Sequence, residues 1–164
     1  MFWKHLWTFL LGIIFIYIQV LIMPAFELFG VIPQIHIPLL VYFVWTRERN
    51  SNLIISFLIG LIYDTTQPAS FGLHALLFVL LVVSLEEFRK PFEEDSLVAK
   101  ILTILLANLV FHLIQLLILG VSYEFSTKLL VTNLIGFAYN LLVSFAVFWA
   151  MQFLSRLRIV VARD

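Results

Sequence analysis

The stretch GLIYDTTQPASFGLHAL, residues 60–76, decides how this chain folds, because it places a polar turn inside an almost wholly apolar sequence. It carries an aspartate, Asp64, and a histidine, His74, ten residues apart. Apolar residues precede Asp64 and follow His74, which predicts two helices joined by a tight turn. Pro68 and Gly72 suit such a turn for backbone reasons alone.

The rest of the chain is equally apolar. Its 164 residues are 63% hydrophobic and 12% charged, and the mean hydropathy is +1.08. A soluble domain is about half apolar and about a quarter charged, so the composition predicts an all-α integral membrane protein in the lipid bilayer, with one membrane domain over residues 1–164. The net charge is zero, which gives no electrostatic case for a nucleic-acid partner. The absence of cysteine excludes disulfides and thiolate chemistry.

Six apolar segments predict a bundle of six transmembrane helices. The segments cover residues 6–23, 31–46, 53–64, 71–86, 97–119 and 129–154. A spanning helix needs about 20 residues, and the third segment is the shortest. It must extend into its polar flanks, thin the bilayer or stop inside the protein. The first segment exceeds the apolar core of a signal peptide and no small-x-small site follows it, so we expect it to be retained.

The basic residues predict the orientation. Nine of the ten lie on one side of this topology, and only Lys128 lies on the other. The nine are Lys4, Arg47, Arg49, Arg89, Lys90, Lys100, Arg156, Arg158 and Arg163. The positive-inside rule makes that side cytoplasmic, so we expect both termini in the cytoplasm. A re-entrant hairpin of segments three and four fits the same charges, and two full spans are favoured. We expect Lys100 to snorkel towards the headgroups.

Polar groups from four segments share one depth near the outer surface in this topology. They are His36, Asp64, His74, His112 and Gln115. Ionisable groups within a bilayer are costly and are candidates for function. We expect this set to serve a partner, a ligand or the structure itself, with Asp64 paired to His74 or to His112 so that its buried charge is neutralised.

Segments five and six each present one narrow polar face. Segment five carries Asn108, His112 and Gln115, and segment six carries Asn133, Gly136, Asn140 and Ser144. Small and amide side chains allow close helix approach and interhelical hydrogen bonds. We predict that these two faces touch, with Asn108 opposite Asn140.

The sequence offers little support for an enzyme. An aspartyl protease needs two carboxylates that share a proton, and the other aspartates, Asp95 and Asp164, fall outside the helices. We expect no glutamate in a helix interior. Metalloprotease, serine hydrolase and P-loop motifs are absent, and the histidine separations match no metal-ligand spacing. We therefore predict no catalytic residue, no metal and no cofactor.

Two stretches carry a family resemblance. Residues 32–45, IPQIHIPLLVYFVW, and residues 56–76, SFLIGLIYDTTQPASFGLHAL, resemble the second segment and the most recognisable motif of the rod shape-determining MreD family of bacterial inner-membrane proteins. The likeness makes Gly60, Asp64 and Gly72 motif positions. It also implies a fold similar to the substrate-binding subunits of energy-coupling-factor transporters.

The resemblance implies a non-enzymatic membrane scaffold of the lateral wall elongation complex. Such a scaffold binds the bitopic protein MreC and is linked through it to the actin-like MreB, to RodA and to the transpeptidase of RodA. The polar residues themselves favour an alternative, a small-molecule binding or transport subunit with an outward-facing polar pocket. Association between copies of the chain stays open.

Overall fold

The computed structural model of the chain describes residues 2–68, 71–93 and 96–161. Within them the protein is all-α, with six α-helices and one short 3-10 helix, η1, which confirms the predicted all-α class and the number of helices. The helices are α1 (Phe2–Leu21), η1 (Met23–Phe26), α2 (His36–Thr46), α3 (Arg49–Asp64), α4 (Leu73–Arg89), α5 (Leu97–Tyr123) and α6 (Thr127–Val161). Asp95, Arg163 and Asp164, which entered the sequence analysis, lie outside the described residues.

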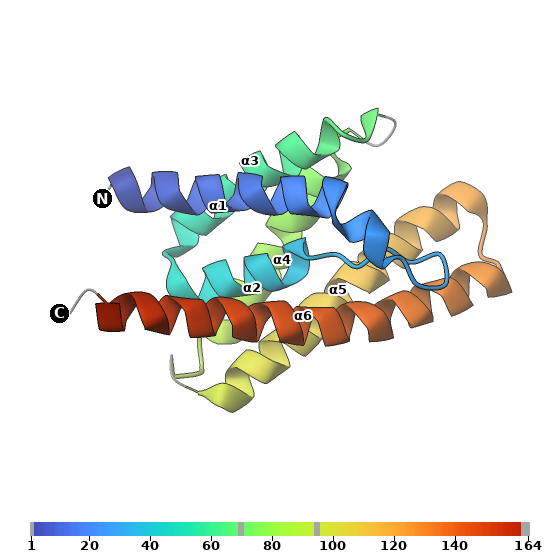
Figure 1. Cartoon of the computed structure of the whole chain (residues 1–164). Coiled ribbons are helices and arrows are strands. Elements are labelled where there is room, and N and C mark those ends of the chain that lie inside the picture. The colour runs from blue at the N-terminus through green and yellow to red at the C-terminus, as the bar shows by residue number, and fades with distance from the viewer. Residues whose placement is uncertain (1, 69–70, 94–95, 162–164) are drawn as a thin grey trace.

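The helices run back and forth between two ends of a bundle. Figure 1 shows the start of α1, the end of α6, and the junctions of α2 with α3 and of α4 with α5 at one end. The connections that leave α1, α3 and α5 lie at the opposite end. We call the end with the two chain termini the terminal end, and the opposite end the hairpin end.

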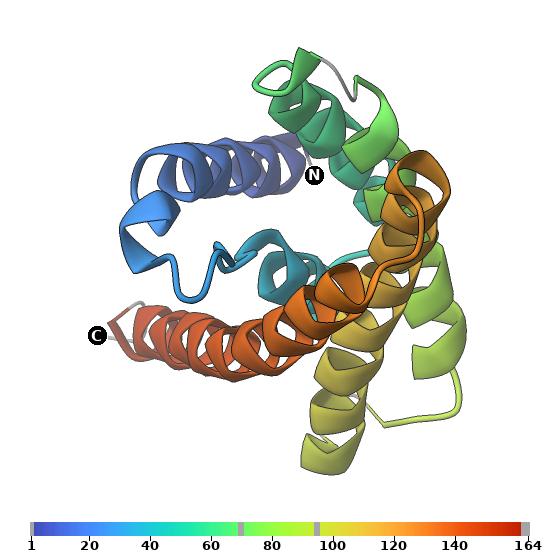
Figure 2. The same ribbon diagram turned by 90° about the vertical axis from the view of Figure 1, so that its right-hand side faces the viewer.

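The short helix α2 forms the centre of the bundle. Its 11 residues include nine that are buried, and it packs against all five other α-helices. Figure 2 shows α1 on one side of α2 and α6 on the other. Side chains of α2 such as Leu40 and Phe43 are fully covered and lie at the middle of the hydrophobic core.

The predicted start of the second segment, residue 31, is wrong, because the helix begins only at His36. Residues 27–35 are irregular instead, and side chains from other helices satisfy their backbone. Gln19 of α1 donates to the Pro33 carbonyl at 3.0 Å and accepts from the Ile35 N–H at 2.9 Å. Non-helical backbone is tolerated at membrane depth where protein groups satisfy it in this way. Gln19, which the sequence analysis did not single out, thus joins α1 to the entry of α2.

The other helices are longer than their apolar segments. The third begins at Arg49 and takes in the polar residues before residue 53, which is the first of the three outcomes considered for it. The sixth runs 35 residues, to Val161. In the described part of the chain, two stretches are long and apolar enough to cross a membrane, Leu97–Ser122 and Thr127–Ser155, while His5–Leu21 and His36–Thr46 are shorter apolar helices.

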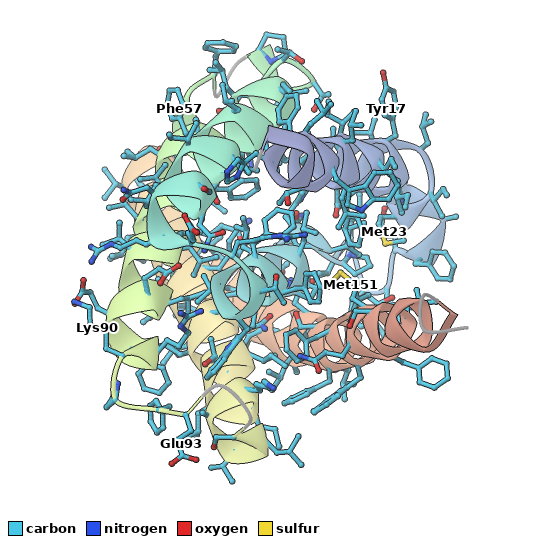
Figure 3. All side chains as sticks on the ribbon, turned by 90° about the vertical axis from the view of Figure 1, so that its left-hand side faces the viewer. Tyr17, Met23, Phe57, Lys90, Glu93 and Met151 are labelled. Carbon is cyan, nitrogen blue, oxygen red and sulfur yellow. The ribbon has the colours of Figure 1, made fainter. Side chains whose placement is uncertain are left out.

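The outward-facing surface is rich in large apolar side chains. Tyr17 of α1 and Phe57 of α3 point away from the bundle in Figure 3 and are 63% and 47% exposed. Met23 and Met151 face the space between α1 and α6 in the same view. An apolar exterior of this kind suits contact with lipid, and it agrees with the membrane class inferred from composition.

Two expectations about charged residues at the terminal end are wrong. Glu86 lies inside α4, one turn from its end, and is buried where Asn52 of α3 donates to its Oε1 at 2.7 Å. The Lys100 ammonium does not snorkel: the residue is buried, and Nζ lies 5.7 Å from the centre of the Trp45 ring. The Arg89 guanidinium lies at the same distance from that ring, so both cations gain from cation–π contact.

Candidate functional site

Asp64, the last residue of α3, caps the start of α4. Its Oδ2 accepts hydrogen bonds from the backbone N–H groups of Gly72 and Ala75, both at 3.0 Å. Its Oδ1 accepts from the backbone N–H of His74 at 3.0 Å and lies 2.8 Å from the His74 ring Nδ1. A carboxylate only accepts, so Nδ1 carries the proton. Four donors converge on a side chain that is fully buried.

The local sequence explains why the cap comes from a neighbouring helix. The N-cap residue of α4 is Gly72, which has no side chain to accept from the first N–H groups of the helix. Its φ of +90° lies in the left-handed region, where glycine is favoured. Asp64 replaces the missing cap, and its negative charge suits the positive end of the α4 dipole.

Close contact between α3 and α4 brings Asp64 to the start of α4. A Cβ built on Gly60 would lie 2.5 Å from the Ala75 Cα and 2.7 Å from the Ala75 backbone nitrogen. Only glycine fits there without moving backbone. The approach of Gly60 to Ala75 places Asp64, one helical turn further along α3, at the first turn of α4.

His36 lies in the same region and packs among aromatic rings. The ring is almost fully covered, and it packs 4.6 Å from the Tyr63 ring and 5.2 Å from the Phe78 ring, centre to centre. Among the described residues neither ring nitrogen has a hydrogen-bond partner. Tyr63 also contacts the His74 ring at 4.7 Å, so an aromatic layer connects His36 to the Asp64 cap.

His112 forms a separate centre with Asn140. The Asn140 Oδ1 accepts from the Gln34 backbone N–H at 2.7 Å, and its Nδ2 lies 2.9 Å from His112 Nε2. His112 therefore pairs with Asn140, and Asp64 pairs with His74. The structure divides the five predicted polar residues into an Asp64 group, with His36 and His74, and a His112 group, with Gln115.

The polar faces of α5 and α6 meet in a register shifted by one turn from the expected one. Asn108 donates to the Ser144 hydroxyl at 3.1 Å, rather than lying opposite Asn140. Asn133 donates to the His112 carbonyl at 3.3 Å. A Cβ on Gly136 would lie 3.2 Å from His112 Cε1, so glycine lets the helices approach at the His112 ring.

A cavity of about 220 Å³ opens beside His112 at the hairpin end. Its walls come from the loop before α2 and from the facing ends of α5 and α6; they include Gln34, His112, Gln115, Asn133, Gly136 and Asn140. All of the residues named here except Gln34 were predicted from the sequence as members of the polar faces of α5 and α6 or of the polar set near the outer surface. Gln34 was not predicted, because its role depends on the irregular backbone before α2.

This arrangement favours a structural or binding role over catalysis. Every oxygen of Asp64 is held by intramolecular donors, and the one other carboxylate shown buried in the described residues, Glu86, belongs to the terminal end. Within the same residues, histidines and carboxylates form no group of three that could hold a metal ion.

Comparison with known proteins identifies the family. The family model described as rod shape-determining protein MreD matches residues 3–159 of the chain. No curated protein and no solved structure matches it. The match spans nearly the whole chain and confirms the resemblance carried by residues 32–45 and 56–76. The chain therefore belongs to the MreD family, whose members are non-enzymatic rod shape-determining proteins of the inner membrane.

Proposed function

We propose that this chain is a multi-pass membrane scaffold of the lateral wall elongation complex. The observation that carries the proposal is the family match over residues 3–159. The geometry of Asp64 supports it, because a carboxylate whose acceptors are all used to hold two helices together has a bracing role. In this proposal such bracing holds the hairpin end in one conformation for a partner.

The scaffold has both termini in the cytoplasm and its hairpin end towards the periplasm. The positive-inside rule supports this orientation, since eight of the nine residues assigned to the cytoplasmic side lie in helices or connections at the terminal end. In this proposal the six α-helices are six membrane spans of uneven length. A fold similar to that of energy-coupling-factor substrate-binding subunits stays a prediction.

The direct partner in this proposal is an MreC-like bitopic protein, through which the chain is linked to MreB, RodA and its transpeptidase. The juxtamembrane part of the partner would meet the hairpin end. Exposed aromatic side chains stand there on three different connections: Phe29 is 85% exposed, Phe71 60% and Phe125 58%. Aromatic anchors of this kind are enriched at protein interfaces.

Co-purification tests the scaffold function. The tagged chain is expressed with an MreC-like partner, extracted in mild detergent and weighed by native mass spectrometry. The proposal predicts a stoichiometric complex that is lost when Phe29, Phe71 and Phe125 are changed together to serine. The matched control changes three exposed side chains away from that end, Phe57, Leu97 and Phe153. The proposal is contradicted if neither the wild-type chain nor the control variant co-purifies with the partner.

A carrier or ligand-binding function is the second candidate, and the cavity beside His112 favours it. In the Asp64 group, Asp64 and His74 are bonded to each other and the His36 ring is covered by the chain, so this alternative rests on His112 and Gln115, which line the cavity. A bound small molecule in the mass spectrum, with no protein partner, would support it.

A further inference from the structure

We propose that the cavity beside His112 is a binding site for an uncharged amide group. Twelve of the residues that the structure describes line the cavity, and none of these twelve is an aspartate, glutamate, lysine or arginine. A charged ligand would find no opposite charge in these walls. The polar groups that do line the cavity are amides, a hydroxyl and an imidazole, mixed with apolar residues such as Val31, Leu119 and Leu129.

The hydrogen bonds fix the proton position on His112. The Gln34 backbone N–H can only donate, so the Asn140 atom that receives it at 2.7 Å is the amide oxygen. The other end of that amide is then the NH₂ group, which can only donate to His112 Nε2 at 2.9 Å. His112 Nε2 is therefore an acceptor, and the neutral ring carries its proton on Nδ1.

That Nδ1–H group is buried without a partner. His112 is 5% exposed, and within the described residues no acceptor lies in hydrogen-bond range of Nδ1. A Cβ on Gly136 would lie 3.8 Å from Nδ1, and both residues line the cavity, so this covered nitrogen lies in the wall of the cavity next to the glycine. A buried donor that makes no hydrogen bond is costly, which favours an acceptor from a ligand.

Asn133 and Gln115 offer acceptors, so the ligand should also carry a hydrogen-bond donor. Asn133 uses its Nδ2 on the His112 carbonyl at 3.3 Å, which leaves Oδ1 as an acceptor. Gln115 lines the cavity with a further amide. An amide ligand offers a carbonyl to His112 and an N–H to these oxygens. An ester or ketone satisfies only the first.

The cavity volume sets the size of the group. An engineered protein cavity of about 150 Å³ binds benzene, so about 220 Å³ accommodates a six-membered ring with a substituent or a short amide-bearing chain. Two sources share this chemistry, a free small amide and an amide group of a partner polypeptide. The inference holds for the isolated chain and does not depend on the scaffold function.

The test uses δ-valerolactam, a six-membered cyclic amide, with the purified chain in lipid nanodiscs and with its histidine ring nitrogens isotopically labelled. The ring spectrum of the free protein should show His112 protonated on Nδ1. The lactam should shift that signal with a dissociation constant on the order of 1 mM, as expected for a ligand of seven heavy atoms. The His36 and His74 signals serve as internal controls and should not move.

Two comparisons make the test specific. Cyclohexanone has the same ring and carbonyl but no N–H, and it should bind at least about fivefold more weakly, the value of one neutral hydrogen bond. Gln115→Leu should weaken lactam binding by a similar factor. Gln152→Leu, on α6 but away from the cavity, is the matched control and should not.

The proposal is overturned if His112 is protonated on Nε2, if about 100 mM lactam leaves its signal unchanged, or if cyclohexanone binds equally well.

If the lactam binds as expected, adding an MreC-like partner identifies the source of the amide group. A partner that shifts the His112 signal and blocks the lactam supplies the amide itself. A partner that leaves both unchanged assigns the site to a free small molecule. Failure of lactam binding leaves the co-purification result of the scaffold proposal untouched.

Discussion

The Asp64 carboxylate holds His74 twice, through the backbone N–H at 3.0 Å and through the ring Nδ1 at 2.8 Å. These two residues lie at the end of α3 and the start of α4, on either side of the turn that interrupts the apolar sequence. The same carboxylate also binds the backbone N–H groups of Gly72 and Ala75. One side chain thus closes a helical hairpin, and it explains how a charge can be buried there.

Asp64→Asn should destabilise the protein by about 2–3 kcal/mol, because the amide NH₂ group faces N–H donors that the carboxylate accepted. Unfolding of the purified protein by a denaturing detergent measures the change. Glu27→Gln removes an exposed carboxylate and is the matched control, with an effect below about 0.5 kcal/mol. His74→Leu keeps the backbone cap and should cost less than Asp64→Asn. The reverse order would show that the ring contact, and not the cap, is the main brace.

Gly60→Ala should cost about 1–3 kcal/mol, since the added methyl group meets the backbone of Ala75 at 2.5 Å and neither helix can yield locally. Gly12→Ala is the comparison. Its methyl group would meet the Ile59 side chain, whose terminal atoms can rotate away. Thermal melts followed by circular dichroism should rank Gly60→Ala as clearly the more damaging. Equal melting temperatures for the two variants would argue against the tight α3–α4 contact.

The α5–α6 register can be read by cysteine pairs, because the natural chain has no cysteine. Cysteines at 108 and 144, and at 112 and 140, replace residues in hydrogen-bond contact and should react efficiently with a short bifunctional reagent. The pair at 108 and 140 is offset by one turn and should react less. Gel mobility of the products gives the ranking. Preferred linkage of 108 to 140 would restore the register expected from sequence.

Asn52→Leu should destabilise the terminal end by about 1–3 kcal/mol, because it leaves the buried Glu86 carboxylate without the donor that lies 2.7 Å away. Changing both residues to leucine removes the charge along with its partner and should recover much of this loss. A double-mutant cycle measured by unfolding supplies the coupling. Additive effects of the two single changes would mean that the contact contributes nothing.

The helices and the α3–α4 turn could be predicted because their signals are local. Apolar runs mark the helices, and residues 60–76 carry glycine, proline and an aspartate where a membrane chain otherwise avoids charge. Pairing of Asp64 with His74 was one of two predicted pairings, since their separation spans a single turn. That Asp64 acts on backbone N–H groups could not be seen, because it depends on Gly72 being the N-cap residue.

What failed depends on contacts between distant parts of the chain. The second helix was predicted to begin at residue 31, but α2 begins at His36. Gln19 and Asn140 satisfy the backbone of residues 33–35, so that backbone can stay irregular. Lys100 is buried because Trp45, more than fifty residues away, offers its ring. Hydropathy along the sequence predicts neither the start of α2 nor the burial of Lys100.

The central claim, that Asp64 braces a scaffold and performs no reaction, is tested by rod shape measured against the amount of folded protein. Cells depleted of the native chain are given graded amounts of the wild type or of Asp64→Asn, and the membrane level and cell aspect ratio are recorded together. The account predicts that both proteins follow one curve, so that raising the level of the variant restores rods. A variant present at the wild-type level in round cells would contradict it.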